Sequence, residues 1–211
     1  MTTGTAVPTG NTYDKYGSTN PVVRRLMAGF ERTLDELFSQ AAPGSVLDVG
    51  CGEGVLTEQW AVRLEGSPTN PHRSRVVGVD LDDPKLAAQW STRTRPNLRF
   101  APMTVEALEF ADDEFDLVAA TEVLEHVQDP ERALAEMARV ACGFLLVSVP
   151  HEPLWRALNL ARGAYVRQLG NTPGHLNHWT RGSFVSLLRN YGEVVQIRSP
   201  FPWTMLLVRV H

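Results

Sequence analysis

The chain has 211 residues, of which 43% are hydrophobic and 21% charged, and its formal net charge is −4 at pH 7. These values fit a single domain with a buried core, and they exclude the basic footprint that nucleic-acid binding requires. No apolar run is long enough for a membrane span. The two cysteines, Cys51 and Cys142, are too few for a disulfide framework, so we expect a reduced, cytoplasmic protein.

The first predicted element is a helix near the N-terminus. Residues 1–12 lack the features of a signal peptide, and we expect them to form a flexible tail. Asn20 and Pro21 are typical of a helix cap and of the first helical residue. The N-terminal helical segment is placed at residues 13–42. Its apolar stripe has a helical period and comprises Val22, Val23, Leu26, Met27, Phe30, Leu34, Leu37 and Phe38.

Short apolar runs then alternate with helical patterns. Strands are predicted at residues 46–49, 75–79, 98–102, 115–120, 144–149, 194–198 and 205–210. Helices are predicted after the first strand, after Asp83, after Asp129 and after Thr180. Residues 13–211 are therefore expected to be one α/β domain. Its architecture is a doubly wound, mostly parallel seven-stranded sheet with an antiparallel edge strand.

The most informative signal is the run V-L-D-V-G-C-G-E-G at residues 46–54. It ends in three glycines at alternate positions: Gly50, Gly52 and Gly54. Glycine permits positive φ and close approach of a ligand, and the helix that follows offers unpaired N–H groups. A dinucleotide site would need a third glycine at Val55. Asp48, in front of the turn, also suits a cationic ligand better than a pyrophosphate.

This pattern resembles the glycine motif of the class I S-adenosylmethionine-dependent methyltransferases. In that family, the acidic residue and the glycine turn hold the amino-acid part of the cofactor. The resemblance implies a Rossmann-like methyltransferase fold and S-adenosyl-L-methionine as cofactor. The implied cofactor-binding residues of this turn are Asp48, Gly50, Cys51, Gly52 and Gly54. The alternative is a tight strand–helix turn that binds no ligand.

The resemblance continues in the G-V-D-L-D run that ends the second predicted strand. In the family, an acidic residue here accepts hydrogen bonds from both ribose hydroxyls, which implies that role for Asp80. A carboxylate can accept two hydroxyl donors. Leu81 is implied to lie against the adenine. The alternative is that Asp80 only caps a turn.

Two further segments complete the implied cofactor site. Family members often carry an acid beyond the third strand that meets the adenine amino group, but Thr104 stands there, followed by Val105. Its hydroxyl or the main chain is expected to replace the acid. After the fourth strand, Thr121 and Glu122 are implied to lie near the methionine amine and the sulfonium. Glu122 and His126 are four residues apart, which predicts one face of a short helix.

Residues 151–179 form an unusually long connection, which we predict to be a helical lid insertion. Aromatic and histidine side chains of this segment and of the N-terminal segment are expected to line the acceptor site. The predicted substrate-binding residues are Tyr13, Tyr16, Trp155, Tyr165, His175 and Trp179. Alternatively, the apolar residues of the connection simply cover the sheet.

Histidines are the candidate general bases, because imidazole titrates near neutral pH. We rank His151 first, then His178 and His126. The spacing of His175 and His178, with His151 as a third ligand, also invites a zinc interpretation. No cysteine or second acid stands at motif spacing, so we expect no metal, and these side chains otherwise serve the structure.

The expected function is transfer of the methyl group of S-adenosyl-L-methionine to O, N or C of a small-molecule acceptor. No nucleic-acid partner is expected. A non-catalytic cofactor-binding or partner-binding protein of the same fold is an alternative, because a fold does not fix a function. An NAD-dependent oxidoreductase is disfavoured by Val55. The acceptor, the need for a base and the oligomeric state are left open by the sequence.

Overall fold

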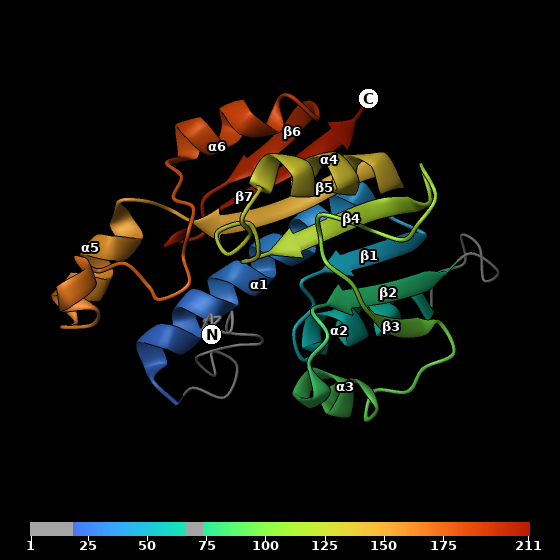
Figure 1. Cartoon of the computed structure of the whole chain (residues 1–211), viewed down its shortest axis with the longest axis horizontal. Coiled ribbons are helices and arrows are strands. Elements are labelled where there is room, and N and C mark those ends of the chain that lie inside the picture. Colours follow the sequence, from blue (N-terminus) through green and yellow to red (C-terminus); the bar gives the residue numbers. More distant parts are fainter. Residues whose placement is uncertain (1–18, 66–73) are drawn as a thin grey trace, which may run out of the picture.

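The computed structural model describes residues 19–65 and 74–211, which build a seven-stranded sheet with helices on both faces (Figure 1). The strands are β1 (Ser45–Val49), β2 (Arg75–Asp80), β3 (Leu98–Pro102), β4 (Phe115–Thr121), β5 (Ala141–Pro150), β6 (Gly192–Arg198) and β7 (Trp203–Val210). Their order is β3-β2-β1-β4-β5-β7-β6. Strands β1 to β5 pair in parallel, whereas β7 pairs antiparallel with both β5 and the edge strand β6. The predicted fold class is therefore confirmed.

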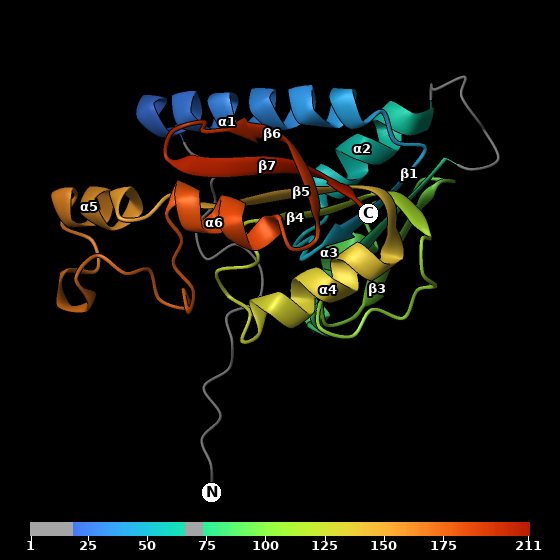
Figure 2. The same cartoon turned by 90° about the horizontal axis from the view of Figure 1, so that it is seen from above.

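Two layers of helices cover the sheet (Figure 2). The helices are α1 (Pro21–Ala41), α2 (Val55–Glu65), α3 (Pro84–Trp90), α4 (Pro130–Val140), α5 (Leu154–Ala161) and α6 (Arg181–Leu188). Buried side chains of α1 and α2 share one core with one face of the sheet, and those of α4 and α6 share a second core with the other face. Helix α5 and the 3₁₀ turn Val166–Gln168 extend beyond the carboxyl ends of β4 and β5 (Figure 1).

Local sequence signals explain where several helices begin. The Asn20 side chain accepts a hydrogen bond from the Val22 amide, with Pro21 at the first helical position. Asp83, Asp129 and Thr180 cap α3, α4 and α6 in the same way. These are the starts that the sequence predicts.

The topology makes the carboxyl ends of β1 and β4 the place where a ligand is expected. The chain runs from β1 to β2 on one side and places β4 on the other, so β1 and β4 form the switch point of the sheet. In open α/β sheets, ligands bind outside the carboxyl ends of the strands at such a point. Strand β1 ends directly in the glycine turn, which therefore lies at this edge.

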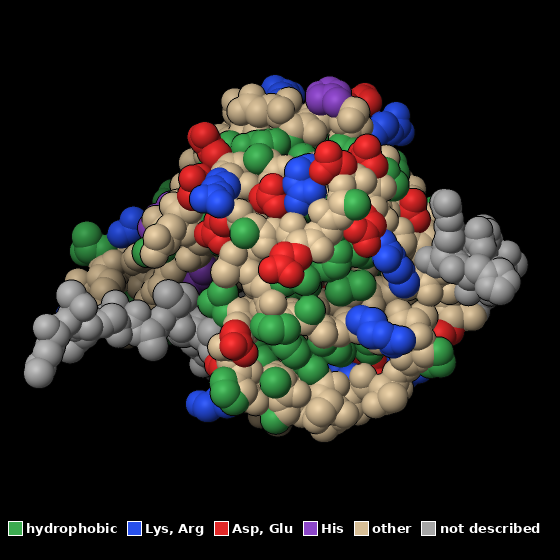
Figure 3. Space-filling view, turned by 45° about the vertical axis from the view of Figure 1, so that its right-hand side comes forward, with side chains coloured by type: hydrophobic (Ala, Val, Ile, Leu, Met, Phe, Trp, Pro, Cys, Tyr) green, Lys and Arg blue, Asp and Glu red, His purple; other side chains and the backbone are tan. Residues whose placement is uncertain are grey.

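The surface of the described residues carries charges of both signs. On the face in Figure 3, acidic and basic side chains are intermixed with apolar ones. Several of the arginines are paired, including Arg93 with Glu58 at 2.6 Å and Arg75 with Glu114 at 2.8 Å. Among residues 19–65 and 74–211, no helix combines the length and the hydropathy needed to cross a bilayer.

Three predicted features fall outside the described residues. They are the tail at residues 1–12 and the two tyrosines of the N-terminal segment, Tyr13 and Tyr16.

Candidate functional site

The glycine turn after β1 contains two glycines needed for packing and one that faces open space. All three have positive φ, at 69°, 54° and 77° for Gly50, Gly52 and Gly54. A Cβ on Gly50 would collide with Val123, and one on Gly54 would lie 2.6 Å from the Phe100 ring. A Cβ on Gly52 would meet no atom within 4 Å. Gly52 is therefore the position where a ligand can approach the main chain closely.

Asp80, at the end of β2, is bound directly to this turn. Its Oδ2 accepts the Gly52 amide at 2.7 Å, and its Oδ1 accepts the Leu81 amide at 2.7 Å. Burial raises the pKa of this carboxyl, against the two amide hydrogen bonds, which lower it. Each carboxylate oxygen can accept more than one hydrogen bond, so Asp80 retains acceptor capacity for hydroxyl donors.

Trp90, at the end of α3, supports the turn from behind. Its indole N–H donates to the Gly52 carbonyl at 2.8 Å, and its ring stacks on Phe100 with centroids 5.4 Å apart. The sequence analysis missed this contact. The only available signal was a tryptophan on the inner face of the helix that follows Asp83.

Asp48 lies beneath the turn rather than in the open. It is 1% exposed, and its Oδ2 accepts the Thr57 hydroxyl at 2.6 Å. Burial, with a smaller contribution from the nearby Asp80 charge, raises the pKa of Asp48 to about 7, against the Thr57 hydrogen bond, which lowers it. Burial also raises the pKa of the neighbouring Cys51 thiol, so this cysteine is a poor nucleophile.

The remaining residues of the implied cofactor site lie along the same edge. Leu81 is 36% exposed beside Asp80. The Met103 amide donates to the Asp80 carbonyl at 2.8 Å and so joins the end of β3 to the end of β2. Thr104 is exposed, whereas Val105 is buried and faces the core.

Glu122 follows β4 in a left-handed conformation, which corrects one prediction. Its φ is +61°, and residues 122–126 form a turn instead of the predicted short helix, because this backbone cannot continue a right-handed helix. The Ser148 hydroxyl donates to Glu122 Oε1 at 3.2 Å, and the Trp203 indole donates to Oε2 at 2.7 Å. Thr121 ends β4 beside it, and the Glu122 carboxylate is held toward β5 and β7.

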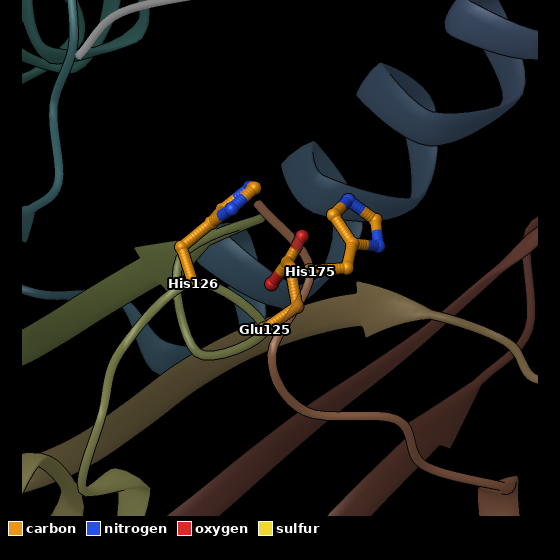
Figure 4. A group of neighbouring side chains, drawn as sticks. All are labelled: Glu125, His126 and His175. Atoms are coloured by element: carbon orange, nitrogen blue, oxygen red, sulfur yellow. The ribbon is translucent and has the colours of Figure 1, made fainter. Parts of the chain in front are cut away.

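The two histidines that the structure brings together are not the two that the sequence ranks first as candidate bases. His126 and His175 form an edge-to-face ring pair with centroids 4.9 Å apart, and the buried Glu125 lies beside them (Figure 4). The structure does not gather His151 or His178 into this cluster. His178 is exposed and bonded to Asn171 Oδ1 at 2.7 Å, whereas the His151 amide donates to the Pro202 carbonyl at 3.0 Å.

The described aromatic residues of 151–179 divide into two groups. Trp155 lies near His175 and Trp203, with ring centroids 6.3 Å and 5.9 Å away. Tyr165 is 37% exposed on the projecting segment, and Trp179 packs against Phe184 of α6. Trp155 thus links His175 to Trp203, whose indole binds Glu122, and Tyr165 and Trp179 do not share these contacts.

Comparisons with known proteins agree with this geometry. Residues 47–143 match the family model described as a methyltransferase domain. A ubiquinone biosynthesis O-methyltransferase of Hahella chejuensis is 39% identical over 113 residues, which cover 51% of this chain and 44% of that protein. The chain thus spans less than half the length of the curated relatives that it matches.

Solved structures resemble the whole described fold. Magnesium protoporphyrin IX methyltransferase from Synechocystis PCC 6803, with bound S-adenosylhomocysteine, has a TM-score of 0.63 and 19% identity, covering 92% of this chain and 90% of that one. The [4+2]-cyclase SpnF has a TM-score of 0.60 and 16% identity, covering 85% and 80%. These likenesses establish a Rossmann-like methyltransferase fold.

The fold, the glycine turn with Asp80 and the matched domain together define the class of protein. Residues 47–143 match the methyltransferase-domain family, and the described fold is similar to the folds of S-adenosylmethionine-dependent methyltransferases. The cofactor of this family is S-adenosyl-L-methionine, and the space beside Gly52 and the acceptor capacity of Asp80 fit it.

Proposed function

We propose that this chain transfers the methyl group of S-adenosyl-L-methionine to a small-molecule acceptor. The observation that carries the proposal is the open space over Gly52 beside the Asp80 carboxylate. The similarity to a ubiquinone biosynthesis O-methyltransferase favours oxygen over nitrogen or carbon as the acceptor atom.

Four segments of this chain would hold the cofactor. The turn at Gly50–Gly54 leaves room for its amino-acid part, and Asp80 accepts hydrogen bonds from the two ribose hydroxyls. The exposed Leu81 offers an apolar surface for the adenine. The Thr104 hydroxyl, shortly after the end of β3, would meet the adenine amino group. Thr121 lies at the switch-point edge, where the reacting end of the cofactor would lie.

When bound, S-adenosylmethionine supplies a methyl group activated by a sulfonium. In the reaction the acceptor atom forms a bond to the methyl carbon. The carbon–sulfur bond would break with its electron pair staying on sulfur, and the acceptor's proton would pass to a base or to solvent water. The residues of this chain align the acceptor in line with that bond and exclude water, and alignment alone supplies about 7–11 kcal/mol in favourable cases.

The acceptor would lie over the ends of β4 and β5. This placement is supported by a row of contacts in which the Trp203 indole binds Glu122, and the Trp155 ring lies beside Trp203 and His175. An aromatic wall with a carboxylate and an imidazole suits a flat, hydroxyl-bearing acceptor. The charge of −4 and the two free cysteines support a small-molecule partner and a cytoplasmic location.

Calorimetry with S-adenosylhomocysteine and with NAD is the first test. Binding of S-adenosylhomocysteine alone is expected, and binding of NAD alone would overturn the proposal. Labelled S-adenosylmethionine should then be offered with phenols, catechols and amines. A second candidate function is cofactor binding without methyl transfer. It is favoured by the similarity of the fold to a [4+2]-cyclase, because one fold can serve different reactions. It predicts cofactor binding with no labelled product from any acceptor.

A further inference from the structure

Glu125, His126 and His175 bring three metal-ligating side chains together beside the proposed acceptor site. One ligand atom of each lies within 4.8 Å of the others. Figure 4 shows the Glu125 carboxylate beside the pair of imidazole rings. The first two residues come from the turn after β4, and His175 comes from the connection between α5 and α6. Two segments that are far apart in the sequence therefore meet at one point.

Hydrogen bonds to backbone carbonyls join the two segments. The amides of Leu176 and Asn177 donate to the Glu125 carbonyl at 2.7 Å and 3.1 Å. The Asn177 side-chain amide donates to the carbonyls of Leu124 and Val127 at 3.0 Å and 2.7 Å. The ligand atoms are thus carried on a fixed frame, as a preorganised site requires.

The tautomer of His126 is set by a neighbouring carbonyl. Its Nδ1 lies 3.0 Å from the Gly174 oxygen, which can only accept a hydrogen bond, so Nδ1 carries the proton. The neutral ring then has its lone pair on Nε2. A ring N–H bound to a backbone carbonyl, with the other nitrogen as ligand, is the usual arrangement of a metal-binding histidine.

Two of the three side chains are buried. Glu125 is 1% exposed and His175 is 9% exposed. Two imidazoles with one carboxylate form a set that suits Zn²⁺ and its transition-metal neighbours better than Mg²⁺.

We infer that Glu125, His126 and His175 bind one divalent transition-metal ion, with Zn²⁺ as the best match. Ligand bonds of about 2.0–2.2 Å would require the donor atoms to close to roughly 3.4 Å apart, which rotation of these side chains can supply. Three protein ligands leave a further position open, as in catalytic zinc sites. If the proposed function is correct, that position faces the acceptor hydroxyl, and the ion would ease loss of its proton.

This inference differs from the zinc interpretation considered for the sequence. That interpretation combined His175 with His178 and His151, and the structure holds those two side chains apart from the cluster. It also departs from the expectation that no metal is bound.

The test measures metal binding on the full chain without a histidine tag. After dialysis against a chelator, Co²⁺ is titrated in and its visible absorption recorded, and Zn²⁺ is used to displace it. Wild type should bind about one equivalent with a low-symmetry spectrum. Glu125→Gln and His175→Ala should weaken binding by about tenfold or more. His178→Ala is the matched control on the same segment and should bind like wild type.

S-adenosylhomocysteine affinity and circular dichroism, measured for each variant, separate loss of the metal site from loss of the fold. Glu125→Gln is nearly isosteric and guards against misfolding. Absence of Co²⁺ and Zn²⁺ binding by the wild type would overturn the inference, as would equal binding by wild type and Glu125→Gln. Neither result touches the proposed cofactor site, whose failure would show as lost S-adenosylhomocysteine binding with metal binding intact.

Discussion

The amide of Gly52 donates to the carboxylate of Asp80 at 2.7 Å, so the turn after β1 and the end of β2 form one rigid unit. The Trp90 indole N–H donates to the Gly52 carbonyl at 2.8 Å. Both backbone polar groups of Gly52 are therefore fixed, while the position of its missing side chain stays open. This arrangement presents a preformed backbone surface to the cofactor.

Gly52→Ala should weaken cofactor binding while leaving the chain folded. The new methyl group would enter the space that the cofactor uses, and we expect affinity for S-adenosylhomocysteine to fall by about tenfold or more. Gly163→Ala is the matched control, because Gly163 also has positive φ and an added Cβ there would meet no atom within 4 Å. Both substitutions should cost about 1–2 kcal/mol of stability. Calorimetry that finds equal affinity in the two variants would place the cofactor elsewhere.

Asp80→Ala should weaken S-adenosylhomocysteine binding by about 1–3 kcal/mol, because the ribose hydroxyls lose their acceptor. The exposed Asp82, two residues further on, provides the control Asp82→Ala. Calorimetry checks both variants. Unchanged affinity for Asp80→Ala, in a chain that melts like the wild type, would contradict the ribose role.

Asp48→Asn should stabilise the cofactor-free chain at alkaline pH. Burial raises the folded pKa of Asp48 from 3.8 to about 7, so between these values the folded chain binds more protons than the unfolded chain. The free energy of unfolding of wild type should therefore fall as pH rises through this window. The asparagine oxygen can still accept the Thr57 hydroxyl. The variant should be more stable by about 1–4 kcal/mol at about pH 8, with the gain vanishing near pH 4.

Denaturant unfolding of both proteins across this pH range measures the difference. A constant difference from acid to alkaline pH would show that Asp48 does not titrate in this window.

Periodicity and caps were enough to predict most of the fold. Strand β3 lies at residues 98–102, as predicted, and the cap residues Asn20, Asp83 and Thr180 begin their helices. Each of these features depends on neighbours within a few residues. The glycine turn could also be predicted, because the spacing of its glycines depends on the local backbone conformation.

Contacts between distant segments could not be predicted in the same way. Glu122 has a left-handed φ, and its carboxylate accepts hydrogen bonds from Ser148 and Trp203. No local sequence pattern predicts this conformation. His126 meets His175 where hydrogen bonds from Leu176 and Asn177 join the connection to the turn after β4. The sequence carries no signal for how a long connection folds back, so it does not indicate that His126 and His175 lie together.

Asn177→Ala should loosen residues 151–179 and thereby test the predicted lid. The Asn177 side chain binds two backbone carbonyls, and its loss leaves the Leu124 and Val127 oxygens without these bonds. At about 0.5–1.5 kcal/mol for each bond, local opening should rise by about tenfold. Trypsin should then cut faster after Arg162 and Arg167, which are exposed on the projecting segment. Mass spectrometry of timed digests identifies the cuts.

Asn190→Ala, at the exposed end of α6, serves as the control and should be cut like the wild type. A lid that closes over the cofactor should also be protected by S-adenosylhomocysteine in the wild type, because closure and local opening compete. Protection should be weaker in Asn177→Ala, whose segment keeps only the backbone bonds from residues 176 and 177 to the Glu125 carbonyl. If ligand leaves the cleavage rate of the wild type unchanged, residues 151–179 are a fixed cover of the sheet and not a lid.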